Sequence, residues 1–574
     1  MNAYEALTDT VDNAFVVTTN EDGFATLDKY VGSVEPYEIT VPQYVDVQGI
    51  RYTINKLGDY AFSNSPEDYQ ENIGRWGSEL HKVVLPETID TIADYVFLAQ
   101  YGALRLQEIN LPNKCVHIGA YAFGLQSELQ NVTLPEALQV IGYHAFANCT
   151  KAFSEANLTL PDAVTAIGGY AFASCTMRTV TFSQTSRLNS IDSYAFSYNE
   201  NLLIVTLPQS LVTLGERAFW RCNNLNEIQM NGGGNDYFIS HKRVLYNKVS
   251  DDEWTIAAYL PKAYTGTYEI PDKVKHVDGI ENAVFNNVVF TSNVTSIAPQ
   301  AFLWCDNLNQ VTIPENCVEI GYAPFCDCSN LQRISVSTDN HVFESIDNML
   351  INKETGELVQ YAVGSLATYI DIPAKVKTIC YYAFYDAHNI EAVVMHDGSV
   401  TDIQDAAFEN CQNIQHIKFP EGLQTIGSAA FYLNICEELS FPASLVSFGT
   451  QAFTNDIDNC LKRLYFYGQT PPYLVYGSIH YMNTYNAFTN SWSKDVLETV
   501  VCYVPYGTKA LYEEYLNTDG NGFKNIVEMD EVAGVHTPTL INAPDAPFYD
   551  LQGRRVDNPQ GGVYIQNGRK VYVR

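Results

Sequence analysis

The amino-acid sequence predicts a β-rich solenoid, a stack of short coils that share one continuous core. The phrase VIGYHAFANCT at Val140–Thr150 recurs as AIGGYAFASCT at Ala166–Thr176, 26 residues later. Most neighbouring copies lie 22 to 26 residues apart, a period typical of solenoids. Degenerate copies place fourteen phenylalanines after a small residue or proline: Phe62, Phe97, Phe123, Phe146, Phe172, Phe196, Phe219, Phe285, Phe302, Phe325, Phe384, Phe408, Phe431 and Phe453.

Each coil is predicted to contain one short strand. The strand phrase appears as LQEINLP at Leu106–Pro112 and as LNQVTIP at Leu308–Pro314, with similar text in other copies. Its alternating, β-branched residues favour a strand, and proline ends the ladder because it has no N–H. The next segment, as in EALQVIGYHAF, has a glycine where the backbone turns and an Ala-Phe pair that points inward from a short helical or irregular turn.

The consensus L-x-x-V-x-L-P-x-x-V-x-x-I-G-x-x-A-F-x-x-C, over residues 55 to 455, resembles the BspA-like leucine-rich repeats on the surfaces of bacterial commensals and pathogens. The resemblance implies an α/β, β-rich leucine-rich-repeat solenoid. Its right-handed superhelix would carry a strand ladder on one face and short helical turns on the other, with inserted β-hairpins and β-rich caps. It also implies surface binding or adhesion to host or bacterial macromolecules, not catalysis.

Two gaps interrupt the repeats, 66 residues from Phe219 to Phe285 and 59 from Phe325 to Phe384. Similar strand, turn and strand text in both predicts protruding β-hairpins near residues 231–275 and 337–375. The expected organisation is an N-terminal β cap (1–53), the solenoid (54–455), a Tyr-rich C-terminal cap (456–530), a linker (531–547) and a small β tail module (548–574). Distinct ends are expected because the terminal coils of an open stack would otherwise expose the core.

Composition and charge restrict the partners. The chain has 574 residues, 46% apolar, and 33 Lys+Arg against 66 Asp+Glu, a formal charge of −33. This composition excludes disorder, and the negative charge disfavours nucleic acid and anionic lipid surfaces. No apolar run approaches the roughly 20 residues that span a bilayer, so membrane insertion is not expected. We therefore expect a monomer that binds a protein or glycan ligand.

The C-terminal tail differs in charge from the rest of the chain. From Tyr549 to Arg574 it has five basic and two acidic residues, or +3, which leaves −36 for the remainder. Alternating apolar residues around NPQGG and QNGRK favour a small β-module. It resembles the C-terminal tails of exported proteins in anaerobic Gram-negative commensals, which implies an exported, cell-surface or extracellular location. The alternative is an extra hairpin docked on the solenoid. The N-terminus lacks the layout of a secretory signal peptide.

Residues that could carry chemistry are better explained by structure. The position three after the phenylalanine is Cys149, Cys175, Asn199, Cys222, Cys305, Cys328, Ala387 and Cys411 in successive copies. Exchange among small residues predicts a ladder of buried thiols and neither disulfides nor a metal site. The histidines are scattered; His144, for example, stands where Tyr170 and Tyr194 stand in sister repeats. No catalytic phrase appears, so we expect no catalytic residue, no cofactor and no enzyme.

One segment has the oxygen-ligand spacing of a calcium loop. Asn517, Asp519, Asn521 and Glu528 are the candidate ligands. The segment departs from that pattern, because asparagine holds the first position and Lys524 stands where an apolar residue is usual. We therefore do not assign a metal site.

The third and fifth residues of each L-x-x-V-x-L strand should face outward and form a display face. Most of these residues are small and polar, but near the C-terminal end cations and aromatic residues appear. Such residues are over-represented in binding hot spots, and aromatic rings also suit sugar faces. The candidate contact patch is His416, Lys418, Arg463 and Tyr465, with Tyr473 and Tyr476 at its rim.

Three alternatives stay open. The tyrosines could merely cover the last coil, or the protruding hairpins could bind the ligand instead. The chain could also be a glycan-processing accessory protein or an enzyme with its site in the Tyr-rich cap, because glycosidase carboxylates often lie far apart in sequence.

Overall fold

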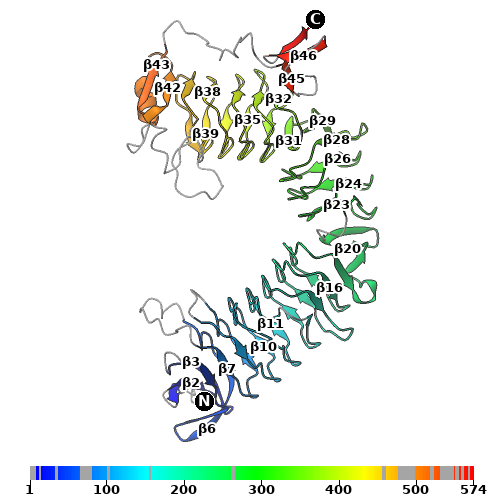
Figure 1. Cartoon of the computed structure of the whole chain (residues 1–574), viewed down its shortest axis with the longest axis vertical. Helices are drawn as coiled ribbons and strands as arrows, with labels where there is room; N and C mark the ends of the chain where they lie inside the picture. Colours follow the sequence, from blue (N-terminus) through cyan, green and yellow to red (C-terminus); the bar gives the residue numbers. More distant parts are fainter. Residues whose placement is uncertain are drawn as a thin grey trace, which may run out of the picture. The chain divides into compact units, whose positions relative to one another are not determined.

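The computed structural model describes residues 8–11, 14–32, 37–64, 80–99, 104–153, 157–259, 265–454, 460–475, 498–516 and 523–529. In the tail it describes residues 548–549, 555–556, 562–566 and 569–573. The chain divides into two compact units, Met1–Ala263 and Tyr264–Arg574. Each unit is a stack of coils built from very short strands, which Figure 1 shows with β10 and β11 in the first unit and β35 and β39 in the second. The predicted β-solenoid is confirmed.

The predicted strand before each proline, called the first strand here, forms parallel ladders. In unit 1 these are β4 (Glu38–Thr40), β7 (Lys82–Val84) and β9 (Glu108–Ile109), then β12 (Leu158–Thr159), β14 (Thr179–Thr181), β16 (Ile204–Leu207) and β18 (Glu227–Met230). In unit 2 they are β22 (Thr267–Glu269), β24 (Asn287–Val289), β26 (Gln310–Ile313) and β28 (Arg333–Val336), then β32 (Tyr369–Asp371), β34 (Ala392–Val394) and β36 (His416–Lys418). The last ladder is β38 (Glu438–Phe441), β40 (Arg463–Phe466), β42 (Val501–Val504) and β43 (Asn525–Glu528).

Each coil also has a second strand, which the sequence pattern did not predict, just before the turn that leads to the phenylalanine. In unit 1 these strands are β8 (Thr91–Ile92), β10 (His117–Ile118), β11 (Val140–Ile141), β13 (Ala166–Ile167), β15 (Ser190–Ile191) and β17 (Thr213–Leu214). In unit 2 they are β23 (His276–Val277), β25 (Ser296–Ile297) and β27 (Glu319–Ile320), then β33 (Thr378–Ile379), β35 (Asp402–Ile403), β37 (Thr425–Ile426), β39 (Ser447–Gly449) and β41 (Tyr473–Val475). The coils therefore carry two strand ladders, where a ladder on one face only was expected.

The turns after the second strands are not helical, so the expected α/β character is not found in the described coils. In most of these turns two residues four apart have positive φ, for example His144 (φ 53°) and Asn148 (φ 62°). A right-handed helix cannot accommodate such residues. The turn amides instead bond to the neighbouring coil, as Phe123 N does to Ala145 O at 2.8 Å. The glycine that opens the turn permits close packing, because a Cβ at Gly142 would lie 2.5 Å from the carbonyl carbon of Gly119.

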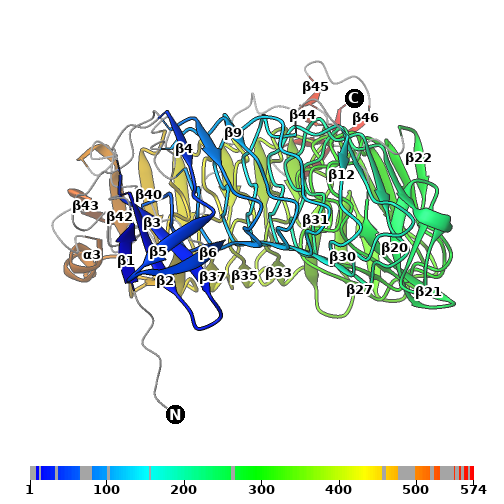
Figure 2. The same ribbon diagram turned by 90° about the horizontal axis from the view of Figure 1, so that it is seen from below.

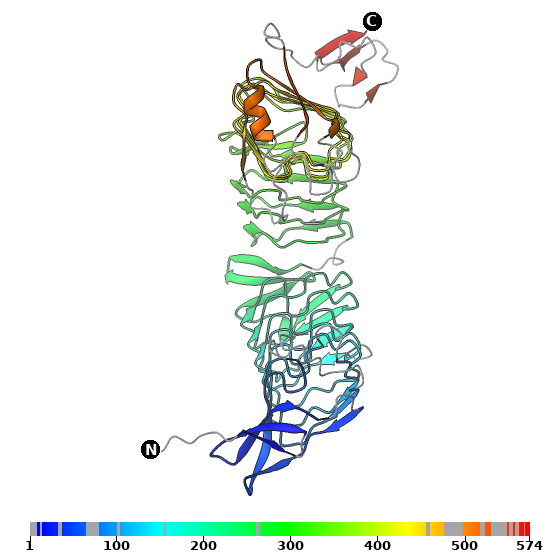
Figure 3. The same ribbon diagram turned by 90° about the vertical axis from the view of Figure 1, so that its left-hand side faces the viewer.

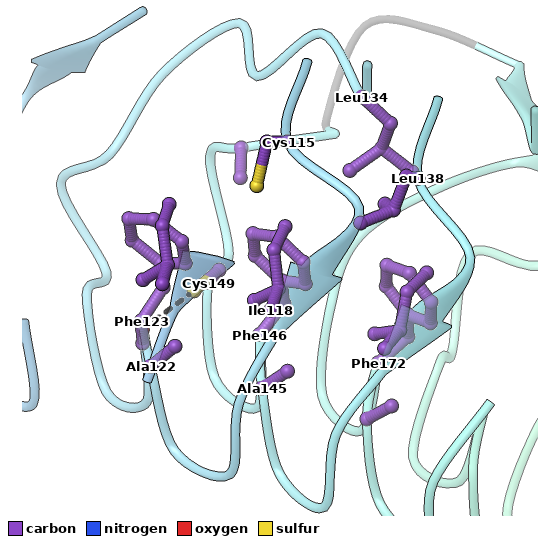
Figure 4. Close-up of a cluster of buried hydrophobic side chains, with 14 of the residues drawn as sticks. Cys115, Ile118, Ala122, Phe123, Leu134, Leu138, Ala145, Phe146, Cys149 and Phe172 are labelled. Atoms are coloured by element: carbon purple, nitrogen blue, oxygen red, sulfur yellow. Dashed lines mark hydrogen bonds between the residues drawn. The ribbon is translucent and has the colours of Figure 1, made fainter. Parts of the chain in front are cut away.

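The core of each unit is a stack of phenylalanine rings, as predicted. Figure 4 shows Phe123, Phe146 and Phe172 at equivalent positions of successive coils, with Ile118 and Leu138 beside them. Ring centroids are 5.1 Å apart between Phe123 and Phe146 and 5.6 Å apart between Phe146 and Phe172. All of these side chains are buried. In unit 2 the corresponding rings of Phe384 and Phe408 lie 4.5 Å apart.

Antiparallel strands begin unit 1, and Figure 2 shows them in dark blue. They are β1 (Thr8–Val11), β2 (Phe15–Thr19), β3 (Phe24–Tyr30), β5 (Tyr44–Val47) and β6 (Ile50–Leu57). β3 and β6 run parallel, and β6 continues into the second-strand ladder through β8. The ring of Tyr30 stacks on Phe62 with centroids 6.1 Å apart, so these strands extend the aromatic core.

Each gap in the repeat pattern holds three antiparallel strands where a two-stranded hairpin was expected. The first contains β19 (Phe238–His241), β20 (Val244–Ser250) and β21 (Glu253–Ala258), and the second contains β29 (Phe343–Ile346), β30 (Met349–Asn352) and β31 (Glu357–Tyr361). The second insertion does not simply protrude, because β31 pairs in parallel with β33. Its Tyr361 ring stacks on Phe384 at 4.9 Å and so takes the place of a core phenylalanine.

The two insertions use the same hydrogen bonds. The Asn235 amide donates to Gln209 O and Leu211 O, and the Asn340 amide donates to Pro314 O and Cys317 O. Lys248 of β20, and Lys353 directly after β30, then donate to the main-chain oxygens of these asparagines. The similarity that the sequence showed between the gaps therefore reflects one shared structural device.

The end of unit 2 contains helix α3 (Lys509–Leu516), drawn in orange beside the yellow coils in Figure 3. Tyr512 of α3 is buried, packs on Phe466 and donates to Gly468 O at 2.9 Å. The tail strands β44 (Phe548–Tyr549), β45 (Arg555–Val556), β46 (Gly562–Gln566) and β47 (Arg569–Val573) form an antiparallel sheet. The predicted linker lies outside the described residues. None of the described helices is long and apolar enough to cross a membrane.

Candidate ligand-binding surfaces

The predicted display face exists. Side chains of the first strands alternate as expected, so that Gln310 and Thr312 of β26 are exposed while Val311 and Ile313 are buried. The same alternation holds in β40, where Leu464 and Phe466 are buried and their neighbours reach the surface. The display face, meaning the outward residues of the first strands, is therefore open to solvent along most of the described ladders of both units, with Val394 of β34 a buried exception.

The structure brings four residues of the predicted contact patch onto neighbouring first strands. His416 and Lys418 lie on β36, which is adjacent to β38, and β38 pairs with β40, which carries Arg463 and Tyr465. Arg463 forms an ion pair with Glu438 across this ladder. Tyr465 stacks on Tyr503 of β42 with ring centroids 4.7 Å apart. The patch is a half-exposed surface of rings and charges.

The predicted rim is not reproduced in full. Tyr473 is exposed, but it lies on β41 in the second-strand ladder, a different sheet from the one that holds Arg463 and Tyr465. The sequence suggested proximity because few residues separate Tyr473 from Tyr465, yet the coil turns between them. Tyr476 lies outside the described residues.

The structure describes only one of the four candidate calcium ligands. Asn517, Asp519 and Asn521 lie outside the described residues. The Glu528 carboxylate accepts hydrogen bonds from Gly507 N at 3.0 Å and Lys509 N at 3.1 Å, at the start of α3. An acceptor there satisfies amides that have no partner within the helix. In the part of the chain that the structure describes, no group of three side chains is arranged to hold a metal ion.

The cysteine ladder has a chemical role that the sequence interpretation missed. Cys149 Sγ donates to Phe123 O at 3.1 Å, and Cys411 Sγ donates to Phe384 O at 3.0 Å. Asn199 fills the same place, with its amide donating to Phe172 O at 2.8 Å. The position therefore selects a hydrogen-bond donor for a buried carbonyl, and small size alone does not explain it. Burial raises the pKa of the Cys175 thiol to about 12, which makes it unreactive.

A row of stacked rings runs along the turns of unit 1, two residues before each core phenylalanine. Neighbouring rings lie 4.6 to 5.2 Å apart and nearly parallel. Its members are Tyr60, Tyr95, Tyr121, His144, Tyr170 and Tyr194. The sequence pointed to this row only through His144, which stands at the tyrosine position. Because each ring covers its neighbours' faces, the row exposes ring edges rather than open platforms.

Turns of unit 2 carry a different group, called the acidic-aromatic cluster here. Its members are Asp327, Asp386, Glu409, Tyr382 and Tyr385. Tyr382 and Tyr385 lie 4.9 Å apart, edge to face, and both pack against the buried group of Leu303, Ala323 and Cys326. Burial is the main cause that raises the pKa of each carboxyl. The sequence interpretation missed the cluster, because its residues come from repeats separated by an insertion.

Comparison with family models identifies the repeats. The BspA type leucine rich repeat region, in six copies, matches residues 48–154, 151–240, 278–362 and 344–460, which together span more than half of the chain. The chain belongs to the BspA type leucine rich repeat family. The predicted resemblance to this family is thus confirmed. The comparison with curated proteins gives no significant match.

Comparison with solved structures gives a match at a TM-score of 0.50 and others below it. A leucine rich cell surface protein from Faecalibacterium prausnitzii is 23% identical, with a TM-score of 0.50 over 72% of this chain and 95% of that one. A leucine-rich repeat protein from Bacteroides ovatus is 19% identical, with a TM-score of 0.39 over 83% of this chain and 100% of that one. The pneumococcal vaccine antigen PcpA is 16% identical, with a TM-score of 0.35 over 92% and 99%.

Proposed function

We propose that this BspA type repeat protein is an exported or cell-surface binding protein without enzymatic activity, which presents its display face to a protein or glycan ligand. The observation that carries the proposal is the patch on β36, β38 and β40, where cations and rings lie together on a face that is mostly small and polar elsewhere. The family match, and the description of the Faecalibacterium prausnitzii protein as a cell surface protein, support the location.

The ion pairs of the patch are of a kind that a ligand can replace. Arg463 pairs with Glu438, and Lys462 pairs with Glu437 at 2.7 Å, with the charged groups largely in solvent. Exposed ion pairs of this kind contribute little to stability, typically about 0 to 1 kcal/mol. A ligand can therefore replace them at little cost. Tyr465, supported by Tyr503, adds an amphipathic ring of the sort that anchors protein and sugar ligands.

The test begins with a binding array of host matrix proteins and glycans, because the ligand class is open between these two. With a ligand in hand, the double change Arg463→Ala and Tyr465→Ala should weaken binding at least tenfold. The matched control is Arg333→Ala with Ser335→Ala, which alters the equivalent outward positions of β28. The control should bind as the unaltered protein does, and both variants should melt at an unchanged temperature.

Two outcomes would contradict the proposal. Unchanged affinity in the Arg463 and Tyr465 double variant would remove the patch as the site, and the inserted strands would become the next surface to alter. Turnover of a glycan or ester panel at enzyme-like rates would contradict a purely binding role and would favour an active site in the Tyr-rich segment 456–530.

A further inference from the structure

The acidic-aromatic cluster arises where the second insertion interrupts the repeat. The insertion supplies Tyr361 to the core stack, but β31 reaches this residue directly, without the turn that precedes the phenylalanine in other coils. Turns from the repeats before and after the insertion therefore come together. Tyr322 and Tyr381, one from each turn, lie 5.3 Å apart edge to face. This junction gathers side chains that the regular repeat would keep separate.

Three carboxyl groups meet at this junction. Asp327 follows Phe325 by two residues, Asp386 follows Phe384 by two, and Glu409 directly follows Phe408. Asp386 N donates to Glu409 O at 3.0 Å, which aligns the two turns. Asp327 raises the pKa of Glu409 through charge repulsion, and Asp386 does the same to Asp327, so the three groups interact. Negative charge is thus concentrated in a partly dehydrated place.

Glu409 is the member that lacks a partner. Its side chain is only 8% exposed, yet its carboxylate makes no hydrogen bond or ion pair with any residue that the structure describes. The other two carboxyl groups have partners: Asp386 accepts from Asn410 and lies 3.1 Å from His388, and Asp327 lies 3.7 Å from the Cys326 thiol. The carboxylate oxygens of Glu409 are not among the fully buried polar atoms that lack a partner, so they can be reached from solvent. A cation bound beside Glu409 would give this carboxylate the opposite charge that the described residues do not supply.

The walls of the junction favour an organic cation. Tyr382 and Tyr385 offer ring surface next to the carboxylates, and burial raises both phenol pKa values, so the rings stay neutral. Rings attract ammonium and guanidinium groups through their negative faces. A bare metal ion needs several oxygen ligands at short range, and no such set exists among the described residues.

We propose that the acidic-aromatic cluster is a binding site for an alkylammonium group of the kind carried by a lysine side chain. The carboxylates supply the opposite charge, and the tyrosine rings pack around the alkyl stem and the cationic head. This site lies on the turns, apart from the display face, and does not depend on the proposed function of the patch. A basic protein and a free amine carry the same chemistry, and the probes below separate them.

The test titrates the full-length protein with three probes and measures heat by calorimetry. The probes are N-acetyl-lysine methylamide, a lysine-rich peptide and the uncharged N-acetyl-norleucine methylamide. Saturable binding of the cationic probes but not of the uncharged one is expected. Glu409→Gln, which keeps the shape, should weaken that binding at least tenfold. The matched control Glu354→Gln, at an exposed turn of the second insertion, should leave it unchanged.

A second variant keeps the test decisive. Tyr385→Leu removes a ring and no charge, and should also weaken the cationic probes if the rings contribute. Binding only of the peptide would identify a protein as the source of the cation, whereas equal binding of the single amino acid would identify a free amine. Equal affinity in Glu409→Gln and the unaltered protein, or no saturable binding of either cationic probe at millimolar concentration, would overturn the proposal.

Discussion

The two units use the same repeat position in opposite ways. Two residues before the core phenylalanine, unit 1 places an unbroken row of stacked rings, from Tyr60 to Tyr194. In unit 2 the equivalent residues are mostly small or polar, and a single ring stands among them. Those with positive φ are Gln300, Ala323, Tyr382, Ala406, Ala429 and Gln451. Both sets have positive φ, so the backbone is the same and only the side chains differ.

This difference shows what an aromatic residue at that position does. In unit 1 the four inner rings of the row are each stacked on a neighbour at both faces, and the row stabilises the stack of turns. In unit 2 Ala323 and Ala406, in the repeats before and after Tyr382, leave this ring without stacked partners. Tyr381 and Tyr385 pack on it at an angle instead, and the charge of Glu409 acts on it. The row therefore supports structure in the first unit, and its interruption permits a binding site in the second.

The largest expected effect concerns what the two units share. Replacing Phe146 in unit 1 or Phe408 in unit 2 by alanine should cost about 3 to 5 kcal/mol of unfolding free energy, because each change removes a ring from a dense core. Denaturant unfolding of each variant measures this. If one unit tolerated the loss while the other did not, the two stacks would not be equivalent, and the comparison of their surfaces would lose its basis.

The next-largest effect concerns the hydrogen-bond donors that stand three residues after the core phenylalanines. Asn199→Ala should cost about 1 to 3 kcal/mol, because it leaves the buried carbonyl of Phe172 without its hydrogen bond. Asn199→Cys should cost less, because cysteine serves this role in neighbouring coils. Unit 2 offers a parallel case: Ala387 cannot donate, and the Gln360 amide donates to Tyr361 O instead, at 3.2 Å. Equal stability of the alanine and cysteine variants would restore the view that size alone matters.

Much of the fold could be predicted from the sequence, because repetition reveals it. Fourteen phenylalanines, most of them 22 to 26 residues from the next, and the alternation in phrases such as LNQVTIP, predicted the core stack and the first strands. The second strands are only two or three residues long, too short for an alternating pattern to register. The turns were expected to be short helices or irregular, because positive φ at non-glycine residues such as Tyr121 leaves no mark in the composition.

The candidate sites also differ in how much of their placement could be predicted from local sequence rules. Arg463 and Tyr465 were placed correctly on the display face, because strand alternation is a local rule. Tyr473 was expected at the rim of the patch but lies in the second-strand ladder, because the path of the chain between two strands is not a local property. The acidic-aromatic cluster was missed for the same reason: Asp327 and Glu409 are brought together only because the second insertion lacks a turn.

A pH-dependent effect tests the cluster itself. Burial, and then the charge of Asp327, raise the pKa of Glu409 to about 7, from 4.5 in the unfolded chain. The folded state therefore holds this proton more tightly, and the associated stability is complete below pH 4.5 and lost as the pH rises through 7. Glu409→Gln cannot ionise, so its melting temperature should rise relative to the unaltered protein between pH 5 and 8. If the difference in melting temperature between Glu409→Gln and the unaltered protein did not change with pH, Glu409 would be solvated like a surface residue.

The smallest expected effect lies in the aromatic row of unit 1. Burial between Tyr121 and Tyr170 lowers the pKa of His144 below its usual 6.5. The unfolded chain therefore binds a proton more readily, and the contribution of neutral His144 to stability, complete above pH 6.5, is lost as the pH falls through the lowered pKa. His144→Tyr supplies the ring found in the sister repeats and removes this titration.

Melting curves at pH 7.5 and pH 5 should show that His144→Tyr loses less stability on acidification than the unaltered protein does. His341→Tyr in unit 2 is the matched control, since His341 is exposed and lies outside any ring stack among the described residues. It should leave the pH dependence of His144 intact. If His144→Tyr and the unaltered protein lost equal stability, the imidazole would not be desolvated in the stack, and the unit 1 row would be a loosely packed surface rather than a continuous support.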